Sequence, residues 1–522
     1  MNMAAFRLII GFLVLATAAP GGDLETTIRR MPDDQKIAQL LLVGYSGQVN
    51  GDELRMLCAS WRVGGIVLYA HNIESPEQVR RLTESISRDA AGGPRPFIAI
   101  DQEGGMVHRL GRGSVVIPSA MAIGATRSAE LARRAGLAVG TSLRDLGLTM
   151  NFAPVLDVLS EPRNTAIGTR AFGDDPGLVG TLGTAFIEGE QEAGIVAVAK
   201  HFPGEGAAAA DPHATLPRIA ASIDELRRHD LLPFREAFAH GLKAVMTAHV
   251  ALPAITGGER PATLSRTVMT DILRSEMHFD GIAITDALQM DALGRDRDPG
   301  ALALEAINAG ADMVLALGGE RDRRRVHDAL LAAYHDGRLP RSRVDQALRR
   351  VLRVKERIAQ ATGTRIADSS RNDIAAEIAR NAVTLTGSPN VLPVGGDERL
   401  LYVGPAGELQ TALHPASSII VSSKPAGVAV AGEDVSRDRS FRLCVAAAAN
   451  EAEFEAIQRI HAKLGDIPTV FVNLGSPFRD IRCARCSTIL TYADDADSQR
   501  TAADVIFGRA PAHGALPVST SQ

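Results

Sequence analysis

Eight short apolar runs constrain the fold more than any other feature of this 522-residue chain. They recur between residues 40 and 317 and alternate with segments of helical periodicity, such as residues 128–146, 176–193, 223–240 and 301–309. The runs are Leu40–Gly44, Gly65–Tyr69, Phe97–Ile100, Thr149–Val155, Ile195–Ala199, Ala244–Ala248, Gly281–Thr285 and Asp312–Leu317. Repeated strand and helix units of this kind predict an α/β fold, a (β/α)8 TIM-like barrel. A doubly wound sheet is the structural alternative.

The chain is long enough for more than one domain, and its hydrophobic content of 45% is ample for packed cores. We expect the barrel over residues 23–362. The helical pattern breaks at Gly363, and the polar stretch that follows predicts a linker over residues 363–385. Further strand candidates then indicate a second domain. They are Leu400–Val403, Ser418–Val421, Leu443–Ala446, Thr469–Asn473 and Thr488–Tyr492.

The N-terminus has the layout of a secretory signal peptide, which we predict over residues 1–19. Arg7 precedes an apolar run that ends in small residues, and the run is too short for a comfortable membrane span. An uncleaved membrane anchor is the alternative. We therefore expect the mature chain to be exported, either periplasmic or extracellular, without stable insertion in the membrane.

The charge and the cysteine content of the chain limit which partners it is expected to bind. The formal net charge is −5, and no basic block is interleaved with aromatic residues, so nucleic acid is not expected to bind. Cys483 and Cys486 have the spacing of half a zinc site or of a redox pair. Because the other half of a zinc site is missing, we favour a structural disulfide or unpaired thiols over a metal.

Polar side chains follow several of the predicted strands, at the end where a barrel carries its chemistry. They are Asp101 after the third strand, residues 151–157 after the fourth, Lys200 and His201 after the fifth, His249 after the sixth and Asp286 after the seventh. A single acidic residue at a strand end is usually a helix cap, but capping does not explain five such ends. The sequence therefore predicts a site at this rim of the barrel.

The segment after the fifth strand, residues 200–217, reads KHFPGEGAAAADPHATLP. It contains a Pro-Gly turn and an alanine-rich span, and it places the carboxylate of Asp211 two residues from the imidazole of His213. A neighbouring carboxylate can fix the tautomer of a histidine and raise its basicity. Asp211 and His213 are thus candidates for acid/base chemistry, although Asp211 before a proline is also a common turn former.

Four motifs occur in the order DQEGGMVHRL (residues 101–110), IGTRAFGDDP (167–176), KHFPGEG with Asp211-Pro212-His213, and ITDALQM (284–290). Together they resemble the family 3 glycoside hydrolases, and the histidine-bearing loop resembles the bacterial β-N-acetylglucosaminidase (β-hexosaminidase) branch. The resemblance covers nearly the whole mature chain. Residues 386–522 resemble the smaller C-terminal α/β sandwich domain that many of these barrels carry.

The resemblance implies a role for each candidate residue. Asp286 corresponds to the nucleophile, and His213 with Asp211 to the acid/base dyad. The implied substrate-binding residues are Asp101, Arg109, Arg170, Lys200 and His201. These roles suit cleavage with retention, which requires a carboxylate on one face of the sugar and a proton donor at the leaving oxygen. The resemblance implies no metal and no organic cofactor.

The chain departs from the family pattern at three positions. Glu205 stands where histidine is usual, Met106 where arginine is usual, and Pro212 where serine is usual. We expect Pro212 to stiffen the dyad loop. We expect Glu205 to add a negative charge near the site, which would favour protonated His213 or repel an acidic ligand.

Three functions are compatible with these patterns. The first is a retaining β-N-acetylglucosaminidase that removes terminal non-reducing N-acetylglucosamine from peptidoglycan fragments or chitooligosaccharides. The second is another activity of the family, either a β-glucosidase-like enzyme whose acid comes from the sandwich domain or a phosphorylase that uses the same histidine dyad. The third is a non-catalytic sugar-binding homologue. The Asp211–His213 pair argues against the β-glucosidase-like enzyme, and intact Asp286 argues against the non-catalytic one.

Overall fold

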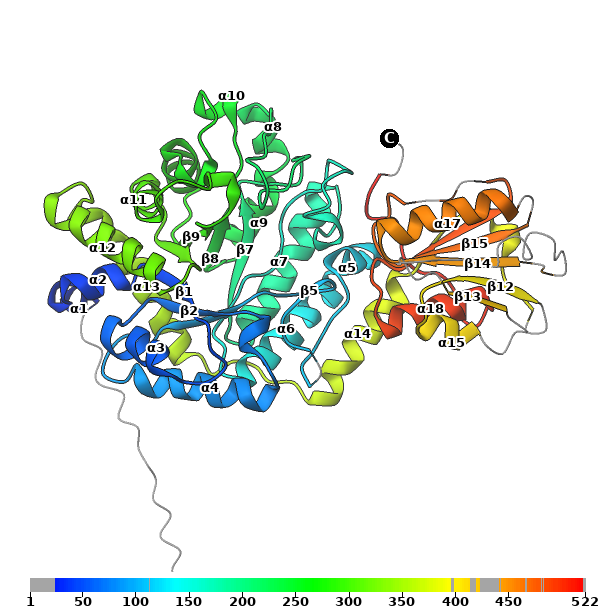
Figure 1. Cartoon of the computed structure of the whole chain (residues 1–522), viewed down its shortest axis with the longest axis horizontal. Coiled ribbons are helices and arrows are strands. Elements are labelled where there is room, and N and C mark those ends of the chain that lie inside the picture. The colour runs from blue at the N-terminus through cyan, green and yellow to red at the C-terminus, as the bar shows by residue number, and fades with distance from the viewer. Residues whose placement is uncertain are drawn as a thin grey trace, which may run out of the picture.

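The computed structural model describes residues 24–519, except for residues 112, 396–398, 414–418, 423–440, 442, 465–466, 480 and 482. The predicted signal peptide, residues 1–19, lies outside the described residues. Two lobes stand side by side, a larger barrel and a smaller sheet domain (Figure 1).

The larger lobe is a closed barrel of eight parallel strands that follow one another in chain order. The strands are β1 (Leu41–Gly44), β2 (Gly65–Leu68), β3 (Phe97–Ile100), β6 (Met150–Asn151), β7 (Val196–Phe202), β8 (Ala244–Thr247), β9 (Ile282–Ala287) and β10 (Met313–Ala316). Strand β1 pairs with β10, with Leu41 opposite Val314, and this pairing closes the barrel. Each strand overlaps one of the eight predicted apolar runs. The predicted barrel is therefore confirmed, and the doubly wound alternative is wrong.

Helices follow the strands around the outside of the barrel. They are α4 (Pro76–Asp89), α6 (Ala129–Asp145), α7 (Pro176–Glu192), α9 (Leu231–Ala239), η5 (Thr267–Glu276), α11 (Pro299–Ala309) and α12 (Glu320–Asp336). Ser75, Ser128, Asp175 and Asp298 cap four of them by accepting a hydrogen bond from a backbone N–H of the first turn. Such caps satisfy N–H groups that have no partner within the helix. They fix where each helix begins after its strand and loop.

One end of the barrel is closed by apolar packing. Helix α13 (Arg341–Gln360) places Val351 and Val354 against the barrel interior, which includes Leu42, Phe97 and Met150. Strands covered on both faces bury nearly every side chain, which explains why their sequences are mostly apolar except near their carboxyl ends. The polar strand ends lie at the opposite rim.

The smaller lobe contains a six-stranded sheet in the order β11 (Thr384–Gly387), β16 (Cys486–Leu490), β15 (Thr469–Asn473), β14 (Leu443–Ala448), β12 (Leu400–Gly404) and β13 (Ile419–Ser422). Its pairs are parallel except for β11, which is antiparallel to β16. Helices α15 (Glu408–Leu413), α17 (Glu451–Leu464) and α18 (Ala496–Ile506) accompany the sheet. The predicted second α/β domain is confirmed, with β11 as a strand that we did not predict. Cys483 and Cys486 form a disulfide, one of the two states favoured over a metal.

The connection between the lobes is structured. Residues 363–385, which we predicted as a linker, hold helix α14 (Asp368–Ala382). Ile374 and Ile378 of this helix join the main hydrophobic cluster of the barrel lobe, and the same cluster reaches Tyr492 in the smaller lobe. Helix α14 packs against α5 (Ala120–Thr126), α6 and α18, so it is a packed connector rather than an irregular linker.

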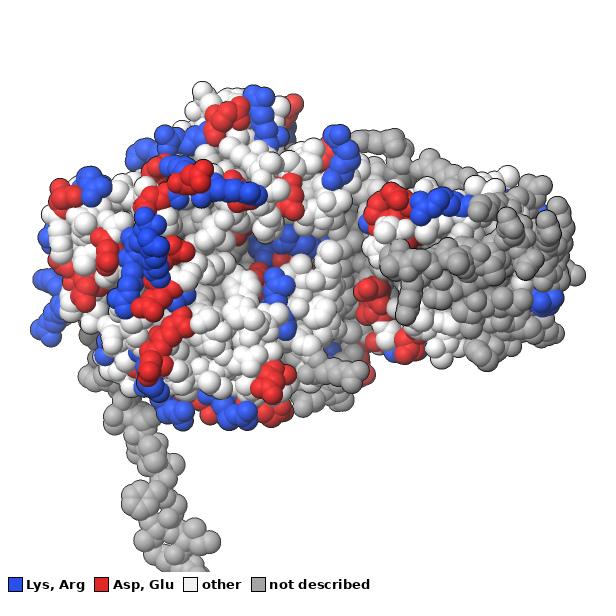
Figure 2. Space-filling view, in the orientation of Figure 1, with Lys and Arg blue, Asp and Glu red and all other residues white. Residues whose placement is uncertain are grey.

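The C-terminal tail returns to the barrel. The N–H of Ala515 donates to the carbonyl of Ala125 at 2.9 Å, and the N–H of Asp174 donates to the carbonyl of Pro517 at 3.2 Å. Figure 2 shows basic and acidic side chains interspersed over one face of the barrel lobe. Among the described residues, no helix is both long and apolar enough to cross a membrane.

Candidate active site

A cavity of about 330 Å³ lies at the carboxyl ends of the barrel strands. Seven of the eight sequence-predicted site residues line it: Asp101, Arg109, Arg170, Lys200, His201, His213 and Asp286. The eighth, Asp211, contacts His213. Apolar and aromatic side chains complete the wall, among them Tyr69, Phe152, Met246, Met290 and Leu315. The structure therefore brings together residues that are as much as 185 positions apart in the chain, from Asp101 to Asp286.

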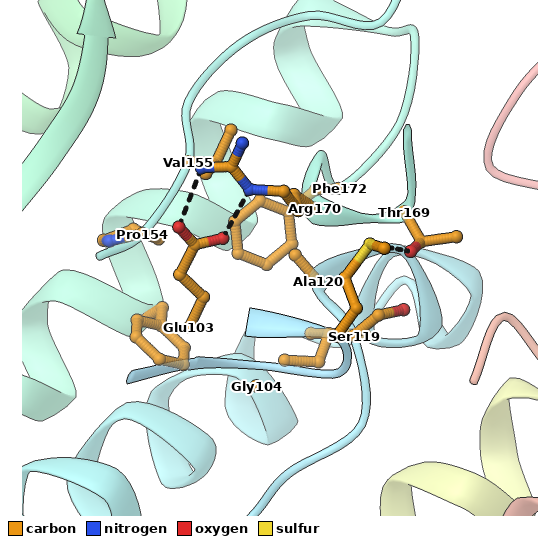
Figure 3. Close-up of a pocket in the computed structure, with 12 residues that line it drawn as sticks. Glu103, Gly104, Ser119, Ala120, Pro154, Val155, Thr169, Arg170 and Phe172 are labelled. Atoms are coloured by element: carbon orange, nitrogen blue, oxygen red, sulfur yellow. Dashed lines mark hydrogen bonds and ion pairs between the residues drawn. The ribbon is translucent and has the colours of Figure 1, made fainter. Parts of the chain in front are cut away.

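An ion-pair network forms one side of the cavity. Lys200 Nζ lies 2.9 Å from Asp101 Oδ1 and 2.6 Å from Glu103 Oε1. Arg170 donates two hydrogen bonds to Glu103, each 2.8 Å long (Figure 3). Burial alone would raise the pKa of Glu103, but the two cations hold it well below its usual range. Bidentate geometry of this kind fixes both side chains and keeps the network ionised.

Glu103 has a structural role that the sequence reasoning missed. It lies two residues after Asp101, within the same DQEGG motif, and is nearly inaccessible to solvent. A second carboxylate in a motif already assigned to the site was the available signal. Its partner Arg170 comes from another loop, so the pairing itself is a property of the fold.

His201 is held by a buried carboxylate. Its Nδ1 lies 2.7 Å from Asp157 Oδ2, and the other oxygen of Asp157 accepts a hydrogen bond of 2.7 Å from the N–H of Glu205. Burial lowers the pKa of His201, but the charge and hydrogen bond of Asp157 outweigh burial and raise it. Asp157 thus positions both His201 and the Pro-Gly-Glu turn. It falls in the predicted polar segment 151–157, where we had not assigned it a role.

Asp286 stands near the end of β9, with its Oδ1 accepting a 2.7 Å hydrogen bond from the N–H of Ala287. Desolvation would raise its pKa, but His249, His201 and this N–H together lower it. His249 is buried beside it and contacts the carbonyl of Ala287 at 3.1 Å through Nε2. Asp286 is therefore an anion that faces the cavity, and His249 supports it from outside the cavity wall.

The Asp211–His213 pair lies on an open loop at the cavity mouth. His213 Nδ1 and its backbone N–H both lie 2.8 Å from Asp211 Oδ1. The side chains are 71% and 49% exposed, so the pair is accessible to a leaving group or to water. The carbonyl of Pro212 accepts a hydrogen bond from Ala292 at 3.2 Å, which ties the loop to the segment after β9.

Two of the residues that depart from the family pattern, Met106 and Glu205, differ in solvent exposure. Met106 is 68% exposed, and its sulfur lies 4.0 Å from Thr169 Oγ1. Glu205 is 3% exposed and lines the cavity, as we expected from the turn, but it lies in the wall with Asp157 rather than on the open loop of His213. Burial, together with the charges of Asp157 and Asp286, raises the pKa of Glu205 to about 7.

Replacing Arg170 with Met is expected to lower the free energy of unfolding by about 3 kcal/mol, because it leaves the buried Glu103 with an incomplete set of charge partners. Thermal or denaturant unfolding measures the effect. Arg163→Met is the matched control, since Arg163 pairs with Glu161 on the exposed surface and should change stability little. Equal losses in the two variants would contradict a structural role for the Arg170–Glu103 pair.

A closed barrel with an anionic carboxylate, an imidazole and a charged ring around a sugar-sized cavity is the arrangement of the barrel glycoside hydrolases. Comparison with known proteins agrees with this class. Residues 33–354 match the family described as "Glycosyl hydrolase family 3 N terminal domain". The chain therefore belongs to glycoside hydrolase family 3.

Several relatives are similar to the chain over much of its length. A "Beta-hexosaminidase" of Pseudomonas aeruginosa is 40% identical over 307 residues, which are 59% of this chain and 90% of that protein. "Beta-hexosaminidase A" of Pseudoalteromonas piscicida is 32% identical over a 381-residue alignment, which covers 67% of this chain and 64% of that protein. A solved family 3 β-N-acetylglucosaminidase from Paenibacillus superposes with a TM-score of 0.85 at 31% identity, covering 94% of this chain and 99% of that one.

Proposed function

We propose that the protein is an exported, retaining β-N-acetylglucosaminidase that removes terminal non-reducing N-acetylglucosamine from peptidoglycan fragments or chitooligosaccharides. One observation carries the proposal: the Asp286 carboxylate and the Asp211-bonded imidazole of His213 line the same cavity from two separate elements. The similar proteins are named as β-hexosaminidases or as a β-N-acetylglucosaminidase, which supports the choice of sugar, and the signal-like residues 1–19 support export.

Cleavage proceeds in two steps. Asp286 Oδ attacks the anomeric carbon and forms a glycosyl-enzyme ester, while the bond to the leaving oxygen breaks and that oxygen takes a proton from His213. Water then gives a proton back to His213 and attacks the same carbon, which frees the sugar and restores the Asp286 carboxylate. Two displacements at one carbon retain its configuration.

The contact between Asp211 and His213 supports Nε2 as the nitrogen of His213 that transfers the proton. Asp211 accepts from Nδ1, so Nε2 is the nitrogen left to exchange a proton with the leaving oxygen or with water. The Asp211 carboxylate also stabilises the imidazolium that gives up its proton in the first step and is restored in the second. The pair is exposed at the cavity mouth, which suits these proton transfers because water can enter and the leaving group can depart there.

The ion-pair network is suited to bind the terminal sugar. Asp101, Lys200 and Arg170 present charged donors and acceptors at the cavity, and each is held by a neighbouring charge. Charge-assisted hydrogen bonds to sugar hydroxyls are stronger than neutral ones. We assign Arg109 and His201 to the same binding set, because both line the cavity. A cavity of this volume holds one sugar ring, which favours removal of terminal residues.

A panel of nitrophenyl β-glycosides, assayed with and without inorganic phosphate, tests the proposal. Among the glycosides of neutral sugars we expect release from the N-acetylglucosaminide alone, and no acceleration by phosphate. Faster release with phosphate, accompanied by a sugar 1-phosphate product, would identify a phosphorylase instead. Sugar binding without release from any glycoside would identify a binding protein.

A further inference from the structure

Glu205 is a carboxyl of the cavity that forms no ion pair with any of the described residues. Lys200 and Arg170 hold Glu103, Lys200 also holds Asp101, and His201 holds Asp157. The basic residues that line the cavity are Arg109, Arg170, Lys200, His201 and His213; the acidic residues that line it or pair with these, Asp101, Glu103, Asp157, Asp211 and Asp286, match them in number. Glu205 is thus one carboxyl more than the cations balance. Within the described residues, no hydrogen bond or ion pair reaches its carboxyl group.

The backbone determines where this carboxyl lies. The N–H of Glu205 donates to Asp157 at 2.7 Å, and its carbonyl accepts from Asn164 Nδ2 at 2.8 Å. The next residue, Gly206, packs so tightly that an added Cβ would lie 1.9 Å from the carbonyl oxygen of Val158. The turn therefore cannot shift easily, and the buried Glu205 side chain is directed at the cavity that it lines.

We propose that Glu205 forms a subsite for a positively charged amino group, so that the cavity accepts 2-amino-2-deoxy sugars whose amine is free, such as the glucosamine units of deacetylated chitin or peptidoglycan. This inference rests on the proposed function, because it concerns the same sugar cavity. An ammonium group supplies three N–H donors and the charge that balances an ionised carboxyl. An acetamide supplies a single neutral N–H, which leaves a buried carboxylate uncompensated.

Binding of such a cation is coupled to release of a proton. The free protein holds Glu205 largely as the neutral acid below pH 7, because burial raises its pKa to about 7. A bound ammonium favours the ionised form, so the pKa falls and a proton leaves the protein. Well above pH 7 the carboxyl is already ionised, and no proton is released. The charges that act on Glu205 most strongly are those of His201, Asp157, Asp286 and Arg170. The other titratable or charged residues that line the cavity are Tyr69, Asp101, Glu103, Arg109, Lys200 and His213.

Titration calorimetry of the full chain with glucosamine and with N-acetylglucosamine, at pH 6 in buffers of different ionisation enthalpy, tests the proposal. Glucosamine is cationic at this pH. We expect it to bind with release of close to one proton, whereas N-acetylglucosamine releases none. In Glu205→Gln the proton release should vanish, and the affinity for glucosamine relative to N-acetylglucosamine should fall by roughly 10- to 100-fold. Glu259→Gln, at an exposed surface ion pair, is the matched control and should leave this ratio unchanged.

Each outcome supports or overturns the subsite. Glucosamine binding without proton release, no binding of glucosamine under conditions where N-acetylglucosamine binds, or an unchanged ratio in Glu205→Gln would overturn it. The wild-type measurement decides the matter even where the variant does not fold. Activity on the nitrophenyl panel reports separately on the proposed function: hydrolysis of the N-acetylglucosaminide without a glucosamine subsite refutes only the inference. Proton-coupled glucosamine binding without hydrolysis refutes only the function.

Discussion

Replacing Asp286 with Asn is expected to give a folded protein with no measurable turnover. The amide keeps the shape of the side chain and an oxygen that can accept the hydrogen bond from Ala287. It lacks the negative charge that attacks the anomeric carbon and that stabilises positive charge developing on the sugar. The kcat of the variant on the nitrophenyl N-acetylglucosaminide measures the effect, and a thermal unfolding curve checks that it is folded.

The control for this prediction is Asp280→Asn. Asp280 precedes the same strand at the opposite end of the barrel, where it pairs with Arg350 and Arg353 on the surface. Removing this charge should leave kcat near the wild-type value. Wild-type turnover in Asp286→Asn would remove Asp286 from the mechanism.

Replacing His213 with Ala is expected to lower turnover by roughly 10²- to 10⁴-fold, the usual contribution of a general acid/base. The loss should be greatest for chitobiose, whose leaving oxygen needs a proton, and smaller for glycosides with acidic phenol leaving groups. Because His213 is exposed, stability should change little. Rate constants for glycosides with a graded series of leaving groups measure the effect.

His335→Ala is the matched control, since His335 is similarly exposed on α12, outside the cavity. Its rates should stay at the wild-type level for every leaving group. Equal losses for good and poor leaving groups in His213→Ala would mean that His213 only binds the substrate.

The barrel could be predicted because its strands are buried on both faces. Most residues of each run are apolar, as in Phe97–Ile100, and the helices begin at caps such as Ser128 for α6. Strand β6 is only two residues long because its run continues into Pro154, which has no N–H for the ladder. The sequence pattern does not show where pairing stops.

Helix α14 and strand β11 could not be predicted in the same way. The polar stretch at the start of residues 363–385 conceals the four-residue spacing of Ile374, Ile378 and Ala382, which pack into the main hydrophobic cluster. Strand β11 is a short antiparallel strand at the sheet edge, and two of its residues are partly exposed. Helix α14 depends on packing between the lobes, and β11 depends on its pairing with β16.

The site residues that belong to recognisable motifs could be predicted from the sequence. Those whose role comes from contacts between distant segments could not. Asp101 follows β3, and Lys200 and Asp286 lie near the carboxyl ends of β7 and β9, so all three lie at one rim. Asp157 acquires its role only by reaching His201 and the turn of Glu205. The contact between Asp157 and the N–H of Glu205 holds Glu205 in the cavity wall. The sequence therefore indicated a charged residue near the site, but not which residues surround it.

Trapping of the glycosyl-enzyme tests the central claim most directly. A fluorinated N-acetylglucosaminyl donor with a good leaving group should form the ester quickly and hydrolyse it slowly, so intact-protein mass spectrometry should show one added sugar. Peptide mapping should place that sugar on Asp286, and Asp286→Asn should show none. An adduct on another residue, or inverted configuration of the first sugar released from an ordinary substrate, would contradict the account.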